Sequence, residues 1–220
     1  MLHALCAAGT SSYHVEDAKT RPSKKPVNAL NYVAPNRSVQ PPADSLPTAR
    51  GLYPVRARLR DGVEIVIRPI GPEDAEREQA FVRALSPESR YFRFMTTLRE
   101  LSPDMLYRFT HPDFQRDLAL VATLGEGGAA RLIGVARCVA DSEGAGAEFA
   151  VVVADQWQNR GVGTRLLCEL MRAARSVGLR RLWGDILANN LRMLALMASL
   201  GFEIQPVPED PLLRRAVRAI

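Results

Sequence analysis

The stretch that most constrains the fold is residues 148–164 of the 220-residue chain. It begins with an apolar run, Phe149 to Ala154, which predicts a buried strand. After a short turn, Gly161 and Gly163 precede a segment with apolar residues at helical spacing. Glycines let backbone N–H groups approach a ligand, and the positive end of the following helix favours an anion. The stretch therefore predicts a strand, a loop and a helix with an anion site between them, suited to a pyrophosphate.

Two other phosphate-binding patterns fit this loop poorly. In a dinucleotide-binding loop, Asp185 would be the acid that binds the ribose. Such a loop needs a third glycine, but Leu166 stands at that position, and it needs a βαβ unit, whereas three antiparallel strands are predicted before this loop. A P-loop is excluded, because no Gly-Lys-Ser/Thr sequence follows the glycines. A plain structural turn remains an alternative.

The order of hydrophobic patterns predicts an α+β fold with a mixed sheet. Glycine-containing clusters at 125–128 and 141–146 separate three apolar runs, which predicts three consecutive antiparallel strands. The helix after the glycine loop would act as a crossover, so the strand after it should be parallel to the strand at 148–154. The predicted strands are 63–68, 118–124, 131–139, 148–154, 181–187, 202–205 and 212–220, and the predicted helices are 72–85, 102–110, 164–179 and 191–200, with a turn or helix at 86–89.

Residues 1–52 are predicted to be a disordered, proline-rich, basic tail, and residues 53–220 a single domain. The first 50 residues lack apolar periodicity and contain six prolines, so they cannot bury enough apolar surface to offset the entropy of ordering. An alternative makes this segment a tether or an arm for an acidic partner, built on Lys24 and Lys25. The remaining residues are close to neutral within the overall charge of +5, so no nucleic-acid surface is indicated.

Other classes are disfavoured by simple counts. No apolar run approaches the roughly 20 residues of a membrane-spanning helix, and the N-terminus lacks the basic start of a secretory signal. The three cysteines have no CxxC spacing and the three histidines are scattered, so we expect neither a disulfide framework nor a metal site. The sequence predicts a cytoplasmic protein with no membrane partner.

The loop sequence resembles the acetyl-CoA-binding motif of the GNAT superfamily of N-acetyltransferases. The family pattern Gln/Arg-x-x-Gly-x-Gly/Ala is matched by residues 158–163, and the later Asn190 and Leu200-Gly201-Phe202 resemble the family's Asn…Gly-Phe segment. The resemblance covers about Arg56 to Ile220. It implies a GNAT fold: a mixed, mostly antiparallel sheet with helices on both faces and splayed central parallel strands. It also implies an acetyl-CoA-dependent N-acetyltransferase that needs no metal.

The resemblance also implies where acetyl-CoA would bind. Backbone amides from Asn159 to Thr164 would hold the pyrophosphate at the helix N-terminus. The pantetheine arm would lie along the backbone of residues 151–153 in the way that an added strand would. This protein strand would part from its parallel neighbour at 154–157. Asn190 would touch the pantetheine or the thioester, although it could serve only as a helix cap. The expected cofactor-binding residues are Val151, Val152, Val153, Gln158, Asn159, Arg160, Gly161, Val162, Gly163, Thr164 and Asn190.

Glu148 is the candidate general base. An amine must lose a proton before it attacks a thioester, and a free lysine has a pKa near ~10.4. Glu148 begins the strand that leads to the cofactor loop, and partial burial in this apolar segment would raise its pKa. Family members often carry a glutamate here. Asp185, on the neighbouring strand, is the runner-up, and an ordinary surface glutamate is the alternative for Glu148.

One expected feature of the family is missing. Its usual general acid is a tyrosine about seven residues after the Asn, and Met197 stands there. The sequence therefore names no general acid. By the same resemblance, an amide at or near Val151 would stabilise the oxyanion.

The acceptor is indicated by Leu85 to Phe94, which closely resembles bacterial protein-lysine acetyltransferases that act on acyl-CoA synthetases, as does Ala147 to Val151. The resemblance implies a protein lysine as acceptor, on an acyl-CoA synthetase or another protein. The arginines and tyrosine of the segment could meet a protein surface, or its aromatic residues could be core and its arginines solvated. A small-molecule amine, or a non-catalytic acetyl-CoA-sensing role, are the alternatives.

Overall fold

The computed structural model describes residues 49–142 and 145–220. Most of the predicted tail, residues 1–48, lies outside these ranges. The folded part begins slightly before the predicted boundary at Tyr53, because Ala49–Leu52 form a 3-10 helix. The carbonyl of Leu52 accepts a hydrogen bond from Arg172 at 3.3 Å, which ties this turn to the domain.

The described residues form an eight-stranded sheet in the order β1-β2-β3-β4-β5-β6-β8-β7, and β5–β6 is the only parallel pair in it. The strands are β1 (Val55–Arg58), β2 (Glu64–Pro69), β3 (Asp117–Leu124), β4 (Arg131–Ala140), β5 (Gly146–Val153), β6 (Arg181–Leu187), β7 (Glu203–Pro206) and β8 (Leu213–Ala219). The α-helices are α1 (Ala75–Ala84), α2 (Pro87–Phe94), α3 (Pro103–Thr110), α4 (Val162–Ser176) and α5 (Leu191–Ser199).

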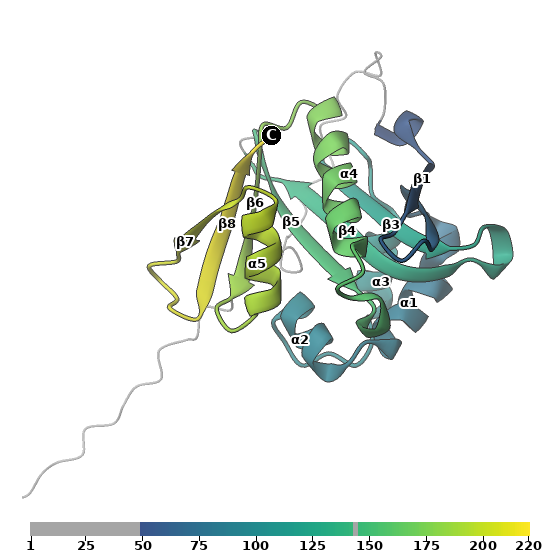
Figure 1. The fold of residues 1–220 in the computed structure, drawn as a ribbon, viewed down its shortest axis with the longest axis horizontal. Coiled ribbons are helices and arrows are strands. Elements are labelled where there is room, and N and C mark those ends of the chain that lie inside the picture. The colour runs from purple at the N-terminus through teal and green to yellow at the C-terminus, as the bar shows by residue number, and fades with distance from the viewer. Residues whose placement is uncertain (1–48, 143–144) are drawn as a thin grey trace, which may run out of the picture.

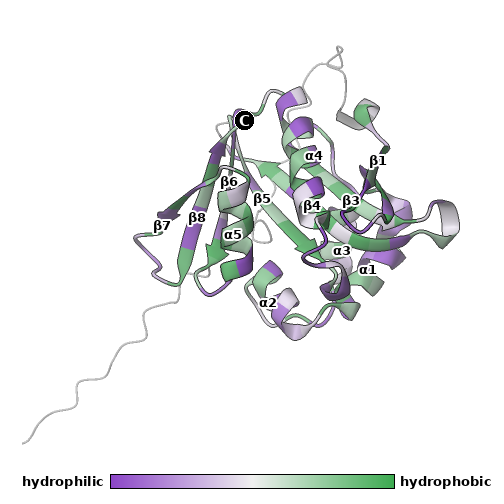
Figure 2. Ribbon diagram, viewed as in Figure 1, coloured by the Kyte–Doolittle hydropathy of each residue, from purple (hydrophilic) through white to green (hydrophobic). Residues whose placement is uncertain are grey.

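Helices cover both faces of the sheet, so the predicted α+β fold is confirmed (Figure 1). α4 and α5 pack on one face, and α1 to α3 pack on the other. In β3, Leu118 and Leu120 join the first core while Ala119 and Val121 join the second. A strand buried on both sides explains the continuous apolar run in this segment, and Figure 2 shows the central strands as mostly hydrophobic.

One hairpin was not predicted. β1 precedes the expected first strand and pairs with it, with Asp61 and Gly62 in the connecting turn. Gly62 has a φ of +86°, the left-handed conformation that such a turn requires. β1 is only four residues long and its burial alternates between half-buried and exposed, so its apolar signal is weak.

The two parallel strands separate earlier than predicted. β5 pairs with β6 only from Gly146 to Glu148, so the expected parting at 154–157 was wrong. Local packing explains the difference. The Phe149 ring lies over Gly184, where an added Cβ would come within 3.0 Å of a ring carbon, and it also packs on Phe202 with ring centroids 5.2 Å apart. Residues after Glu148 therefore have a strand partner on the β4 side alone.

Candidate active site

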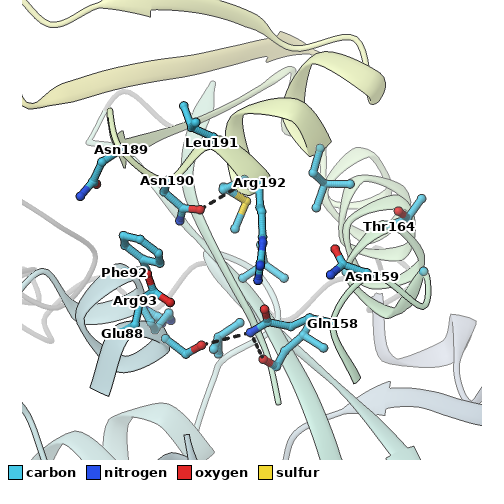
Figure 3. A pocket seen from close by; sticks show the side chains of 18 of the residues that line it. Glu88, Phe92, Arg93, Gln158, Asn159, Thr164, Asn189, Asn190, Leu191 and Arg192 are labelled. Carbon is cyan, nitrogen blue, oxygen red and sulfur yellow. Dashed lines mark hydrogen bonds between the residues drawn. The ribbon is translucent and has the colours of Figure 1, made fainter. Parts of the chain in front are cut away.

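A cavity of about 440 Å³ lies where α2, β5, the glycine loop and the start of α5 meet. Figure 3 shows Gln158 and Asn159 from the loop, Phe92 from α2 and Asn190, directly before α5, around this space. The cavity thus joins the predicted cofactor loop to the predicted acceptor segment. Its lining residues are Arg60, Glu88, Ser89, Phe92, Arg93, Val151, Val152, Val153, Gln158, Asn159, Gly161, Gly163, Thr164, Asn189, Asn190, Leu191, Arg192, Met193 and Leu196.

The glycine loop has the backbone conformation that an anion cradle needs. Asn159 and Gly161 have φ angles of +59° and +94°, and Gly161 is the N-cap of α4. The first hydrogen bond of the helix runs from the Arg165 amide to the Gly161 carbonyl, at 3.0 Å. The amides of the first turn have no acceptor within the helix, so they can donate to a bound phosphate. The loop therefore fits the pyrophosphate of a CoA thioester.

Most of the predicted cofactor residues line the cavity, and two do not. Arg160 is not among the lining residues; it forms an ion pair with Asp61 and stacks on Trp157, with its guanidinium carbon 4.1 Å from the ring centroid. Val162 is buried in the core beneath the loop. The predicted residues that line the cavity are Val151, Val152, Val153, Gln158, Asn159, Gly161, Gly163, Thr164 and Asn190.

A polar junction connects the glycine loop to the start of α2. Asp155 accepts hydrogen bonds from the Ser86 amide at 2.9 Å, the Ser86 hydroxyl at 2.6 Å and the Ser89 hydroxyl at 2.7 Å. Gln158 donates to the Ser89 hydroxyl at 3.0 Å and to the Val153 carbonyl at 3.2 Å. Gln158 therefore has a structural role, because its side-chain amide joins β5, the loop and α2.

A second, smaller cavity of about 40 Å³ adjoins the first and contains Glu148. Both cavities are lined by Phe92, Arg93, Val151, Asn190 and Met193. Glu148 is half-buried and is the last residue of β5 that pairs with β6, directly before the two strands separate. The separation therefore brings the predicted base next to the larger cavity.

Asp185 also lines the smaller cavity, but its carboxylate is already engaged. Arg215 donates to both of its oxygens, at 2.7 Å each, and these hydrogen bonds raise the pKa of Arg215 above its ordinary value. Arg215 also stacks on Trp183, with its guanidinium carbon 4.6 Å from the ring centroid. A carboxylate held in this bidentate pair is poorly placed to accept a proton from a substrate.

Asn190 has the capping role that its position in the sequence allows. Its side-chain oxygen accepts a hydrogen bond from the Met193 amide at 3.2 Å, while the residue also lines both cavities (Figure 3). Met197, at the position of the usual general acid, is fully buried in the core and lines neither cavity.

The α2 segment divides its residues between core, cavity and surface. Phe94 is buried and Tyr91 is 46% exposed. Arg90 donates to the carbonyls of Leu85 at 2.6 Å and Arg83 at 3.0 Å, so it caps the end of α1. Arg93 is 9% exposed and lines both cavities. The interpretation of both arginines as solvated was therefore wrong.

Sequence reasoning missed Arg60 and several residues of α5 as lining residues, namely Leu191, Arg192, Met193 and Leu196. Arg60 belongs to the unpredicted turn between β1 and β2, and the Asp61-Gly62 dipeptide was the signal that could have located it. Met193 follows Asn190 by one helical turn, so helical spacing alone places it on the same side.

Within residues 49–142 and 145–220, no group of three or more His, Cys, Asp or Glu side chains could hold a metal ion. No helix in these ranges is long and apolar enough to cross a membrane.

Comparisons with known proteins agree with this geometry. The model of the acetyltransferase (GNAT) family matches residues 82–202. Acetyltransferase PA5475 of Pseudomonas aeruginosa is 38% identical over 152 residues, which cover 69% of this chain and 82% of that protein. Acetyltransferase Pat of Mycolicibacterium smegmatis is 32% identical over 151 residues, which cover 68% of this chain but only 44% of that protein.

A solved structure supports the same assignment. The GNAT domain of S. lividans PAT has a TM-score of 0.71 and 31% sequence identity, over 76% of this chain and 97% of that one. The splayed parallel strands, the glycine loop at the start of α4 and these relatives lead to one conclusion. The chain belongs to the GNAT family of acetyltransferases.

Proposed function

We propose that this acetyl-CoA-dependent acetyltransferase modifies a primary amine, specifically a protein lysine side chain, and that Glu148 removes the proton from that amine. The observation that carries the proposal is the position of Glu148. It lies where β5 and β6 separate, in the small cavity that adjoins the cavity of the glycine loop. The choice of lysine rests on the resemblance of residues 85–94 and 147–151 to bacterial protein-lysine acetyltransferases.

The residues of the larger cavity fit a CoA thioester. First-turn amides of α4 would bind the pyrophosphate, and the β5 residues that lack a partner on the β6 side would align the pantetheine. Arg60 and Arg192 add positive charge to the lining, which favours a polyanionic ligand. When bound, acetyl-CoA supplies an acetyl group activated as a thioester.

The chemistry required of the protein is then a proton transfer. The neutral amine nitrogen forms a bond to the acetyl carbon, the carbon–sulfur bond breaks, and the nitrogen loses a proton. Glu148 accepts this proton directly or through one water, and sulfur leaves as a thiolate that water can protonate. Asp185 is less suited to this role, because both of its oxygens accept hydrogen bonds from Arg215.

The acceptor is tested by incubating the protein with labelled acetyl-CoA and either a purified acyl-CoA synthetase or a panel of amino acids, polyamines and aminoglycosides. We expect label on lysines of the synthetase and at least about tenfold lower kcat/KM for every small amine. Efficient labelling of a small amine, with none of the protein, would overturn the choice of lysine. The chain's own lysines are Lys19, Lys24 and Lys25, so a variant with arginine at all three separates self-labelling from transfer.

Gly161→Val is expected to weaken acetyl-CoA binding by at least about tenfold. Gly161 has a φ of +94°, which a β-branched residue rarely adopts, so the cradle of amides would be displaced. Isothermal titration calorimetry with acetyl-CoA measures the change. Gly125→Val is the matched control, because Gly125 also has a positive φ and open space around it but lies in the β3–β4 turn. Equal affinities in the two variants would contradict the assigned role of the loop.

A further inference from the structure

Arg93 occupies an unusual position for an arginine. It lies in the last turn of α2, is 9% exposed and lines both cavities. Its guanidinium carbon lies 5.0 Å from the centroid of the Phe94 ring and 5.9 Å from that of Phe109. One nitrogen, Nη1, is fully buried and has no hydrogen-bond partner among the described residues. A buried guanidinium without full pairing is costly, so neighbouring anions must compensate for its charge.

Three charged groups on three different elements act electrostatically on Arg93, and one of them, Glu148, lines the smaller cavity together with it. They are Glu78 on α1, Arg137 on β4 and Glu148 on β5. Burial and the charge of Arg137 lower the pKa of Arg93 to about 10, whereas Glu78 and Glu148 oppose this shift. Arg93 is therefore still a cation at neutral pH.

The other neighbours are committed elsewhere or lose their charge. Arg137 donates to the Phe109 carbonyl and lies 3.8 Å from Asp117. Burial raises the pKa of Glu78 to about 7, against the attraction of Arg137 and Arg93. Below neutral pH Glu78 is therefore largely protonated, and Glu148 is the other carboxyl among the three groups that act on Arg93.

We propose that Arg93 is a positioning residue that holds Glu148 as a carboxylate beside the separating strands. The inference rests on the proposed role of Glu148 as general base. Arg93 acts from α2, on the acceptor side of the cavity, and its charge favours the form of Glu148 that can accept a proton. Asp185 of β6 lines the smaller cavity together with Glu148. The charge of Glu148 also contributes to the raised pKa of Arg215 on β8, after the larger effect of Asp185. Arg215 donates to both oxygens of Asp185, whereas Nη1 of Arg93 has no hydrogen-bond partner among the described residues.

The direct test is a carbon-13 NMR titration of the Glu148 carboxyl carbon, assigned by its loss in Glu148→Gln. In Arg93→Gln we expect the midpoint of this titration to rise by about one pH unit, because an opposite charge is removed. In Arg93→Lys, which keeps the charge, the midpoint should stay within about half a unit of the parent value. An unchanged midpoint in Arg93→Gln would overturn the proposal.

Glu78→Gln is the matched control. It alters the same buried cluster, but burial raises the pKa of Glu78 to about 7, so below that pH the replacement removes no charge and should shift the Glu148 midpoint much less than Arg93→Gln does. If Arg93→Gln fails to fold because Glu78 is left without its cation, the double variant Arg93→Gln/Glu78→Gln removes both charges. That variant should still show the raised midpoint, and a parent-like midpoint there would equally refute the role of Arg93.

The pH dependence of turnover gives a second readout. We compare kcat/KM of Arg93→Gln with that of the parent at each pH, with an acyl-CoA synthetase as acceptor. Protonation of the acceptor amine affects both values equally, so their ratio reports only on the protein. We expect a loss of about tenfold on the acidic side that diminishes as pH rises. A pH-independent loss would indicate a structural role only. If Glu148→Gln keeps full turnover, the proposed base fails, whereas the NMR midpoint still decides the electrostatic role of Arg93.

Discussion

Turnover of the Glu148→Gln variant is expected to fall by about 10²- to 10⁴-fold while acetyl-CoA affinity changes little. Glutamine keeps the shape of the side chain but cannot accept the proton of the attacking amine. Glu148 lines the smaller cavity and not the cavity of the glycine loop, so its replacement should leave the proposed acetyl-CoA contacts unchanged. Thiol release measures turnover, and calorimetry measures acetyl-CoA binding.

Two further variants make this result specific. Glu203→Gln changes an exposed glutamate on β7, far along the sheet order from β5, and should retain parent turnover. Asp185→Asn breaks the bidentate pair with Arg215 and should reduce stability more than it reduces the chemical step. Normal turnover in Glu148→Gln together with loss in Asp185→Asn would transfer the role of base to Asp185.

The largest effect on stability is expected for Asp74→Ala, about 3 kcal/mol of the free energy of unfolding. Asp74 is fully buried, and it accepts hydrogen bonds from Arg68 at 2.6 and 2.7 Å, from Arg77 at 3.1 Å and from the Gly71 amide at 3.1 Å. Its loss leaves two guanidinium groups without their anion. The side chains of Arg68 and Arg77 are each 25% exposed, so the effect should lie at the lower end of the range for buried pairs. Urea unfolding measures it.

The contribution of Asp74 should also depend on pH. Burial alone would raise its pKa, but the hydrogen bonds from Arg68, Gly71 and Arg77 hold it below the ordinary 3.8. The stabilisation is therefore complete above about pH 4 and is lost as the pH falls through the lowered pKa. The control is Glu100→Ala, which breaks the pair with Arg83, whose two side chains are 59% and 55% exposed. It should cost less than about 1 kcal/mol, and equal losses in the two variants would contradict the prediction.

Much of the fold could be predicted because local signals and tertiary structure agree. The apolar face of α4 and the positive φ of Gly161 follow directly from residue type and spacing. The parallel relation of β5 and β6 follows from the helix between them. The apolar run at 118–124 correctly indicated a strand, which the structure has as β3.

Other features depend on contacts between distant residues, which a single sequence does not contain. The separation of β5 from β6 is set by how Phe149, Gly184 and Phe202 pack together. Arg93 is buried against aromatic rings from two helices, Phe94 of α2 and Phe109 of α3. The residues next to Arg93 in the sequence do not reveal the contact with Phe109, so the sequence alone could not distinguish it from a solvated arginine. For the same reason, spacing along the chain located Asp185 near the site but could not reveal its engagement by Arg215.

The early separation of the parallel strands has a consequence for the stability of the whole domain. Beyond Glu148, β5 is an interior strand of the sheet that behaves as an edge strand, because only β4 pairs with it. Open edges are where proteins are prone to associate with foreign strands. A cofactor that lies along this inner edge would cover its unpaired backbone groups and would bind the native state alone. By mass action, a higher concentration of the cofactor would then raise the free energy of unfolding. Scarcity of the acetyl donor would then lower the amount of intact enzyme as well as its rate.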